Sequence, residues 1–180
     1  MHAARRLLVT TLTALLATLA LATTGTLTSP AAASAASVDD YPYRTDTTQA
    51  ADQWGFTKRQ CVSFAAWRLA QHHVALRNST QDWGSAYRWD GTAKRLGYRI
   101  STRPAVGAIA QWHRNERSPW YANGASSANG YIQAGDYGHV AVVRSVFADG
   151  SVLVEQYNMG GSRSYSTMHL KAPRYLYVGV

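Results

Sequence analysis

The sequence predicts an α+β domain in which N-terminal helices pack on an antiparallel β-sheet. Apolar residues recur with a helical period up to about residue 97, and after Pro104 they alternate as in strands. Helices that precede the strands, rather than alternate with them, are typical of the α+β class. Without its first 36 residues the chain keeps 144 residues, enough for one domain with its own core.

Residues 1–36 have the pattern of a secretory signal peptide. A basic start, "MHAARR", is followed by the apolar run "LLVTTLTALLATLALA" and then by the small residues of "SPAAASAAS". Threonines interrupt the apolar run, which falls short of the roughly 20 residues of a membrane-spanning helix. We therefore expect cleavage after Ala33, Ala35 or Ala36, a secreted protein, and no membrane attachment afterwards.

The remaining chain is basic and contains a single cysteine. Loss of Arg5 and Arg6 with the signal peptide lowers the net charge from +8 to +6. Such a charge suits a polyanionic surface, but the basic residues are scattered, which disfavours nucleic acid as the partner. Cys61 has no partner for an intramolecular disulfide, so it is buried, paired between chains, or reactive.

Residues 37–56 lack a clear period, and we expect a linker or N-terminal arm there, followed by the domain at 57–180. The first helix is predicted from about Lys58 to His73, where one apolar face is formed by Val62, Ala65, Ala66 and Leu69. Thr57 and Gln60 fit a capping box at its start. Cys61 then lies in the first turn, where free backbone N–H groups and the helix dipole stabilise a thiolate.

A second helix is predicted over 83–97, and strands follow it. The turn "ADG" at 148–150 indicates a hairpin. The expected strands cover 106–113, 138–147, 151–158, 164–170 and 175–180. Residues 114–137 read as a long loop, either disordered or used to bind sugars or peptides through Trp120, Tyr121 and Tyr137.

A reactive Cys61 needs a base, and His139 is the best candidate. It follows Gly138 and opens the most apolar predicted strand, whereas His72 and His73 lie about three turns away at the far end of the first helix. A third group should orient the histidine. Asn158 and Glu155 are the candidates, although alternation along a strand places them on opposite faces unless a bulge intervenes.

Four motifs, "QCVSFAAW", "RPAVGAIAQW", "YGHVAVV" and "VLVEQYN", occur here in the order in which they occur in CHAP domains, the cysteine, histidine-dependent amidohydrolases/peptidases. The resemblance covers about residues 50–180 and implies a papain-like fold. It implies Cys61 as nucleophile and His139 as base. Gln60 matches a residue that helps to hold the oxyanion, and its capping role remains an equal alternative.

The third catalytic position departs from the family pattern. The family often has an acidic residue two places before the Asn, where this sequence has Gln156. We expect Asn158 to orient His139, with Glu155 as the second choice. Four aspartates precede Cys61: Asp39, Asp40, Asp46 and Asp52. Their spacing is not that of a recognisable calcium-binding loop, so we expect neither a metal nor a cofactor.

Together with these observations, the resemblance implies a secreted, monomeric cysteine hydrolase, associated with the cell wall, that cleaves amide bonds in peptidoglycan. Its activity would be that of an N-acetylmuramoyl-L-alanine amidase or of an endopeptidase. The alternative is a non-catalytic module that binds the cell wall through the aromatic residues of 114–137. That alternative gives no reason for Cys61 at a helix start together with His139 at the start of a strand.

Overall fold

The structure, a computed structural model, describes residues 38–122, 125 and 127–180. The expected signal peptide at 1–36 lies outside the described residues. The helices are α1 (Cys61–Gln71), α2 (Asn78–Gln81) and α3 (Trp89–Arg95), with short 3₁₀ helices η1 (Ala86–Arg88) and η2 (Met159–Gly161). Within the described residues, no helix is both long and apolar enough to cross a membrane.

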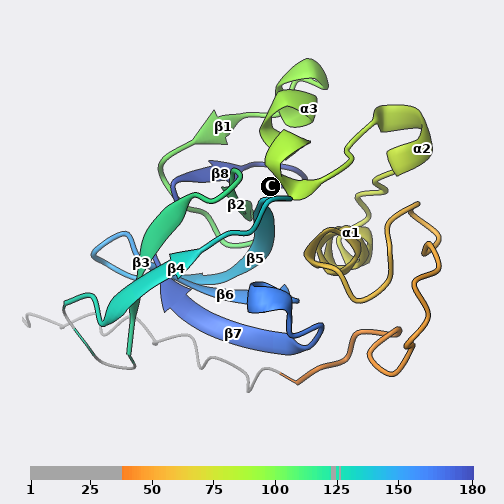
Figure 1. The fold of residues 1–180 in the computed structure, drawn as a ribbon. Helices are drawn as coiled ribbons and strands as arrows, with labels where there is room; N and C mark the ends of the chain where they lie inside the picture. Colours follow the sequence, from red (N-terminus) through yellow and green to blue (C-terminus); the bar gives the residue numbers. More distant parts are fainter. Residues whose placement is uncertain (1–37, 123–124, 126) are drawn as a thin grey trace, which may run out of the picture. The chain divides into compact units, whose positions relative to one another are not determined.

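Eight strands form one antiparallel sheet, so the predicted α+β class is confirmed (Figure 1). The strand order in the sheet is β1-β8-β2-β5-β6-β7-β3-β4. The bounds are β1 (Ile100–Ser101), β2 (Ile109–Trp112), β3 (Arg117–Tyr121), β4 (Gly130–Gln133), β5 (His139–Val146), β6 (Val152–Tyr157), β7 (Tyr165–Leu170) and β8 (Arg174–Leu176). The five expected strands correspond to β2, β5, β6, β7 and β8.

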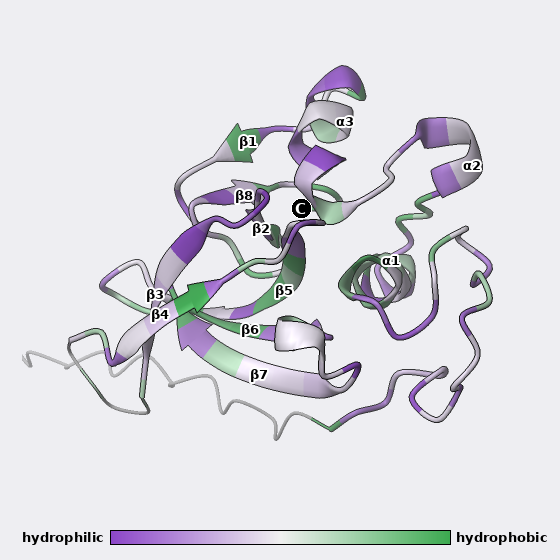
Figure 2. Ribbon diagram, in the orientation of Figure 1, coloured by the Kyte–Doolittle hydropathy of each residue, from purple (hydrophilic) through white to green (hydrophobic). Residues whose placement is uncertain are grey.

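The sheet buries apolar residues on both faces. On one face α1 packs alongside β5 and β6 (Figure 1), and Phe64, Ala65, Ala66 and Leu69 of α1 are buried there with Val140 and Val142 of β5. The other face has its own core of small and branched residues from β2, β5 and β6, closed by Trp112 and Tyr175. Figure 2 shows the resulting apolar stretch along β5. A strand buried on both faces reads as a continuous apolar run, as this one does in the sequence.

Residues 114–137 are not the long loop that we expected, because they contain β3 and β4. The two strands pair with each other, and Trp120 of β3 lies opposite Gly130 of β4. A Cβ atom at Gly130 would lie 2.9 Å from the indole nitrogen of Trp120, so glycine makes room for this ring. The Gly, Asn and Ser content of the segment suggested a loop, but Gly130 is part of a hairpin in which the large side chain of Trp120 requires a residue without a side chain opposite it.

The described part of the expected linker, residues 38–56, belongs to the folded domain. Tyr41 is fully buried, and Trp54 and Phe56 are at least 90% buried in the core beneath α1. Asp40 forms an ion pair of 2.7 Å with Arg68 of α1. The segment has no helical or strand-like hydrophobic period because it forms no regular secondary structure. Its aromatic side chains nevertheless pack it against the helix that carries Cys61.

Candidate active site

Cys61 lies in the first turn of α1, as predicted, but the helix begins at Cys61 rather than near Lys58, and the expected capping box is wrong. The N-cap residue is Gln60, and no side chain caps the helix. Thr57 instead forms an isolated β-bridge with Ala51. The chain turns sharply before the helix at Arg59, which has a φ of 60°. This left-handed residue, rather than a capping box, places Cys61 at the start of the helix.

Hydrogen bonds from the N-terminal segment support this turn. The backbone N–H of Arg59 donates to the hydroxyl of Tyr41 at 3.3 Å, and that hydroxyl also shares a hydrogen bond with Ser63 in α1. Ser63 donates in turn to the carboxylate of Asp52. The other carboxylate oxygen of Asp52 accepts the backbone N–H groups of Trp54 and Phe56, each at 2.9 Å. The start of α1 is therefore held by a buried network that does not involve the sulfur.

The thiol of Cys61 is neutral in this structure at neutral pH. Burial raises its pKa to about 11, and backbone N–H groups of Val140, Val62 and Cys61 itself oppose the rise. The interaction with Val140 is informative, because Val140 follows His139 directly in β5. Cys61 and His139 are 78 residues apart in the sequence, and the fold brings the sulfur to the backbone of the residue beside the histidine.

His139 opens β5 and is 4% exposed. Its Nε2 donates to the Oε1 of Gln156 at 2.9 Å, and the amide nitrogen of Gln156 donates to the hydroxyl of Ser166 at 3.3 Å. The Gln156 side chain is thus held between the ring of His139 and the hydroxyl of Ser166. With the proton on Nε2, Nδ1 keeps its lone pair and can accept a proton. Burial lowers the pKa of His139 to about 4, although the bond to Gln156 raises it.

Glycine is required at position 138 to place His139. Gly138 has a φ of +70°, and an added Cβ would lie 2.6 Å from the carbonyl oxygen of Trp112 and 2.7 Å from the backbone nitrogen of Tyr87. The chain enters β5 between these two backbone segments. On the far side of the glycine, the carbonyl of Tyr137 accepts the N–H of Tyr87 at 3.1 Å.

The structure corrects the expected partner of His139, which is Gln156 rather than Asn158 or Glu155. Alternation along a strand would place Asn158 on the same face as Gln156. Asn158 lies beyond the end of β6, however, with φ 60° and ψ 30°, so this alternation does not extend to it. Its amide nitrogen donates to the Oε1 of Gln60 at 2.6 Å. Glu155 faces α1 and forms a 2.7 Å ion pair with Arg68. Strand alternation applied to Gln156 itself would have identified it as a candidate.

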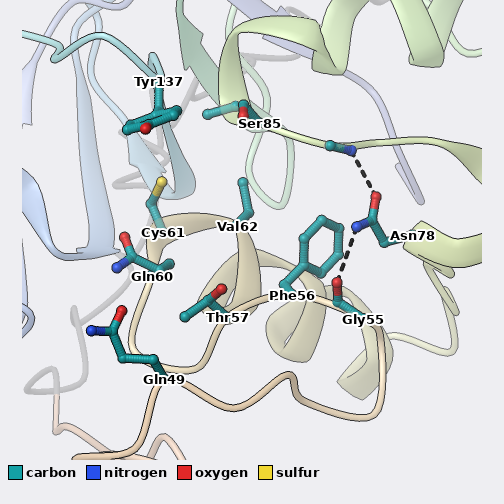
Figure 3. A pocket seen from close by; sticks show the side chains of 12 residues that line it. Gln49, Gly55, Phe56, Thr57, Gln60, Cys61, Val62, Asn78, Ser85 and Tyr137 are labelled. Carbon is teal, nitrogen blue, oxygen red and sulfur yellow. Dashed lines mark hydrogen bonds between the residues drawn. The ribbon is translucent and has the colours of Figure 1, made fainter.

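A cavity of about 500 Å³ opens at the start of α1 (Figure 3). Gln60 and Cys61 line it, and the sulfur points toward the ring of Tyr137 across the opening. The rest of the wall is mostly small or polar: Gln49, Gly55, Phe56, Thr57, Val62, Asn78, Gly84, Ser85 and Ala86. The cavity thus exposes the thiol to a ligand of moderate size and offers it mainly hydrogen-bonding groups.

Of the three aromatic residues predicted to bind substrate, Tyr137 lines this cavity, and its side chain is 74% exposed. Trp120 packs against the core on the other face of the sheet. Tyr121 stacks on His169 at a centroid distance of 5.0 Å. Trp120 and Tyr121 are therefore part of the β3–β7 region, and the cavity wall does not include them. The described residues also contain no group of three His, Cys, Asp or Glu side chains arranged to hold a metal ion.

The described geometry combines a thiol at a helix start, a buried imidazole with a free Nδ1, and a cavity beside the sulfur. These are the parts of nucleophilic catalysis with a paired base. Asn158 and Gln60 form a hydrogen-bonded pair of amides next to Cys61, a contact that residue spacing does not predict. Neutral amide side chains thus lie beside both Cys61 and His139: Gln60 precedes Cys61, and Gln156 bonds to His139.

Comparison with known proteins agrees with this geometry. The chain is 34% identical over 110 residues to an N-acetylmuramoyl-L-alanine amidase of Staphylococcus haemolyticus, which covers 61% of this chain and 25% of that protein. It is 32% identical over 97 residues to a probable autolysin of Staphylococcus aureus, or 53% of this chain and 28% of the relative. It is 36% identical over 78 residues to a secretory antigen of the same species, and the match covers 43% of this chain and 22% of that relative.

A crystal structure of an N-acetylmuramoyl-L-alanine amidase from Staphylococcus aureus shares the fold, with a TM-score of 0.53 and 23% identity over 79% of this chain and 38% of that one. This chain spans about a quarter of the length of the curated relatives it matches. The CHAP domain model matches residues 51–158, more than half of the sequence. The chain therefore belongs to the CHAP domain family.

Proposed function

We propose that this protein is an extracellular cysteine hydrolase that cleaves amide bonds in peptidoglycan, with Cys61 as nucleophile and His139 as base. The observation that carries the proposal is the position of the Cys61 sulfur. It interacts with the backbone of Val140, directly after His139, and it faces a cavity of about 500 Å³. The named relatives, two of them an amidase and an autolysin, supply the substrate class.

The pKa values of the two groups describe the starting state of the reaction. A thiol pKa of about 11 and an imidazole pKa of about 4 leave both groups neutral at pH 7. The proton of the thiol therefore moves to Nδ1 of His139 as the sulfur attacks the carbonyl carbon. The N-terminal end of the α1 dipole favours the thiolate that results.

The second half of the reaction uses the same proton. The tetrahedral intermediate collapses, the C–N bond breaks, and the imidazolium protonates the leaving amine. Water, deprotonated by His139, then attacks the thioester and releases the carboxylic acid and the free thiol. The oxyanion receives the backbone N–H of Cys61 and a side-chain N–H of Gln60, since both residues lie at the cavity.

Gln156 takes the place of the third catalytic group in this proposal. As a neutral acceptor it keeps the proton on Nε2 of His139 and leaves the lone pair of Nδ1 able to accept a proton. A carboxylate would stabilise the imidazolium more strongly than a neutral amide does. With Gln156, the imidazole is held in the reactive tautomer without being protonated in advance.

Among the possible bonds, the N-acetylmuramoyl-L-alanine amide is the first choice, because that activity is in the names of a relative and of the structural neighbour. A bond within the peptide is the alternative. A non-catalytic wall-binding module has less support, since Trp120 and Tyr121 pack in the β3–β7 region and only Tyr137 is at the cavity. The predicted signal peptide and the relatives named as secretory antigens support an extracellular location.

The test is hydrolysis of purified peptidoglycan by the wild-type chain and by Cys61→Ser and Cys61→Ala variants. Both variants should lose at least 1,000-fold in rate, as expected for loss of a catalytic nucleophile, roughly the effect seen across triad enzymes. Circular dichroism should be unchanged. Mass spectrometry of the products identifies the bond from the new amino terminus. A Cys61→Ser variant that clears peptidoglycan at the wild-type rate would refute the proposal.

A further inference from the structure

The loop from Asn158 to Arg163 bonds to both residues that precede Cys61. Asn158 donates from its side chain to the Gln60 side chain, and the backbone carbonyl of Arg163 accepts an Nη2–H of Arg59 at 2.7 Å. We propose that Asn158 is a positioning residue that acts through Gln60, by fixing the Gln60 amide so that its N–H groups remain available to the oxyanion. The inference rests on the proposed function and assigns Asn158 a role separate from His139.

The backbone of Arg163 determines the orientation of both amides. Its N–H donates to the Asn158 side chain at 2.7 Å, so the atom that receives it must be the oxygen of that amide. The Asn158 nitrogen is then the atom that faces Gln60, at 2.6 Å, and the atom of Gln60 that it meets must be an acceptor. One backbone N–H therefore fixes the orientation of two side chains that could otherwise rotate by 180°.

The consequence is a pair of amides whose oxygens are both engaged. Gln60 Oε1 accepts from Asn158, and Asn158 Oδ1 accepts from Arg163. The N–H groups without a partner in the described structure are both on Gln60 Nε2 and one on Asn158 Nδ2. Gln60 lines the cavity beside Cys61, so its unpaired N–H groups are the part of the amide that an oxyanion in the cavity can use.

The start of α1 does not depend on this contact. The N–H of Arg59 is held by Tyr41, Gln60 accepts the N–H of Phe64 with its own carbonyl, and Ser63 is held by Asp52. Asn158 has a φ of 60°, a left-handed conformation that asparagine adopts more readily than most residues. A glycine at this position would keep that backbone and remove only the amide.

The Asn158→Gly variant should therefore lower the rate of peptidoglycan hydrolysis about 10-fold, a part of the 100- to 1,000-fold effect of removing an oxyanion donor. Asn158→Asp keeps an acceptor for Arg163 but has no N–H for Gln60, and it should lose at least as much. Alkylation of Cys61 by iodoacetamide passes through no oxyanion. Its rate in Asn158→Gly should stay within about 2-fold of the wild-type rate, whereas a disturbed helix start would change it.

A double-mutant cycle with Gln60→Ala decides whether Asn158 acts through Gln60. Gln60→Ala should cost about 100-fold, and adding Asn158→Gly should then have no further effect, because interacting residues are not additive. A further 10-fold loss in the double variant, or a parallel loss of alkylation in Asn158→Gly, would overturn the inference. Either result leaves the dependence on Cys61 intact, so it is distinguishable from failure of the proposed function, in which Cys61→Ser keeps its activity.

Discussion

Glu155 and Gln156 are neighbours on β6, and they serve two different hydrogen-bond systems on opposite faces of the sheet. Glu155 faces α1, where both of its oxygens accept from Arg68 at 2.7 and 2.9 Å, and Arg68 also pairs with Asp40. Gln156 faces the other way and accepts from His139 at 2.9 Å. One system is ionic and the other is neutral, although the side chains differ only by a carboxylate and an amide.

The difference separates stability from proton transfer. The ionic system joins the N-terminal segment, α1 and the sheet through one guanidinium that is only 9% exposed, and bidentate pairs of this kind are strong and directional. At His139 a carboxylate would favour the protonated ring, and the proposed reaction begins with an unprotonated one. The charged residues thus join structural elements, whereas the residue that bonds to His139, where proton transfer is proposed, is neutral.

The largest expected effect comes from breaking the ionic system. Arg68→Met removes the main partner of Glu155, whose remaining cation is Arg144 at 3.4 Å, and it should destabilise the fold by about 3–5 kcal/mol, as for other broken buried pairs. Urea denaturation followed by circular dichroism measures this. Arg88→Met is the matched control, since it breaks the exposed 2.7 Å pair with Asp82 and should cost no more than about 1 kcal/mol. Equal losses in the two variants would contradict the assigned role of Arg68.

The two systems should also respond to acid in different pH ranges. Burial lowers the pKa of His139 from 6.5 to about 4, so the unfolded chain binds a proton that the folded chain refuses between these values. Stability should therefore fall as pH decreases from about 6.5 to 4, by up to about 3 kcal/mol. Arg68 lowers the pKa of Asp40 from 3.8 against the effect of burial, so its contribution is lost only below about pH 4.

Urea denaturation at a series of pH values tests this separation. Replacing the histidine, as in His139→Gln, should flatten the dependence between pH 6.5 and 4 and leave the change below pH 4 in place. An unchanged slope in that variant would mean that His139 is not the group that titrates.

Introducing charge into the neutral system should change activity rather than stability. Gln156→Ala removes the acceptor of His139 and should reduce hydrolysis about 10- to 100-fold, the lower part of the range for acid–base catalysis. Gln156→Glu restores an acceptor and should raise the pKa of His139 by about 1–3 units through the nearby negative charge. The acid limb of the pH–rate profile should move to higher pH by the same amount, and an unmoved limb would argue against contact between residue 156 and His139 as the proposed base.

The smallest effect is expected at the cavity rim. Tyr137→Ala removes an exposed ring across from the sulfur and should raise KM a few-fold, on the order of 1 kcal/mol of lost contact, with kcat unchanged. Tyr121→Ala is the matched control, since its ring stacks on His169 in the β3–β7 region. A similar rise of KM in both variants would show that substrate binding extends well beyond the cavity.

The regular elements were predictable because their patterns are local. The apolar face of α1, the apolar run of β5 and the "ADG" turn before β6 all follow from residue spacing, and the structure contains each of them. The position of Cys61 at a helix start was also predictable. The capping box gave the right position for the wrong reason, because the turn depends on Arg59 and Tyr41 instead.

The errors concern long-range contacts. The burial of Tyr41 depends on α1 and β6, and the contacts of Asn158 depend on where β6 ends and on the backbone N–H of Arg163, five residues after Asn158. No local pattern reports either. Gln156 was not predicted as the partner of His139, because a neutral amide stabilises an imidazolium less than the adjacent carboxylate does. The two-residue period of a strand nevertheless places Gln156 on the opposite face from Glu155.

The burial of Tyr41 has a practical consequence for anyone who shortens this protein. The family match begins at residue 51, and a fragment cut there would still contain Cys61, His139 and all the strands of the described residues. It would lack the fully buried ring of Tyr41, the support of Arg59 and one carboxylate partner of Arg68. A fragment that retains residues from Val38 onward is the one whose folding and lytic activity can fairly be compared with those of the whole chain.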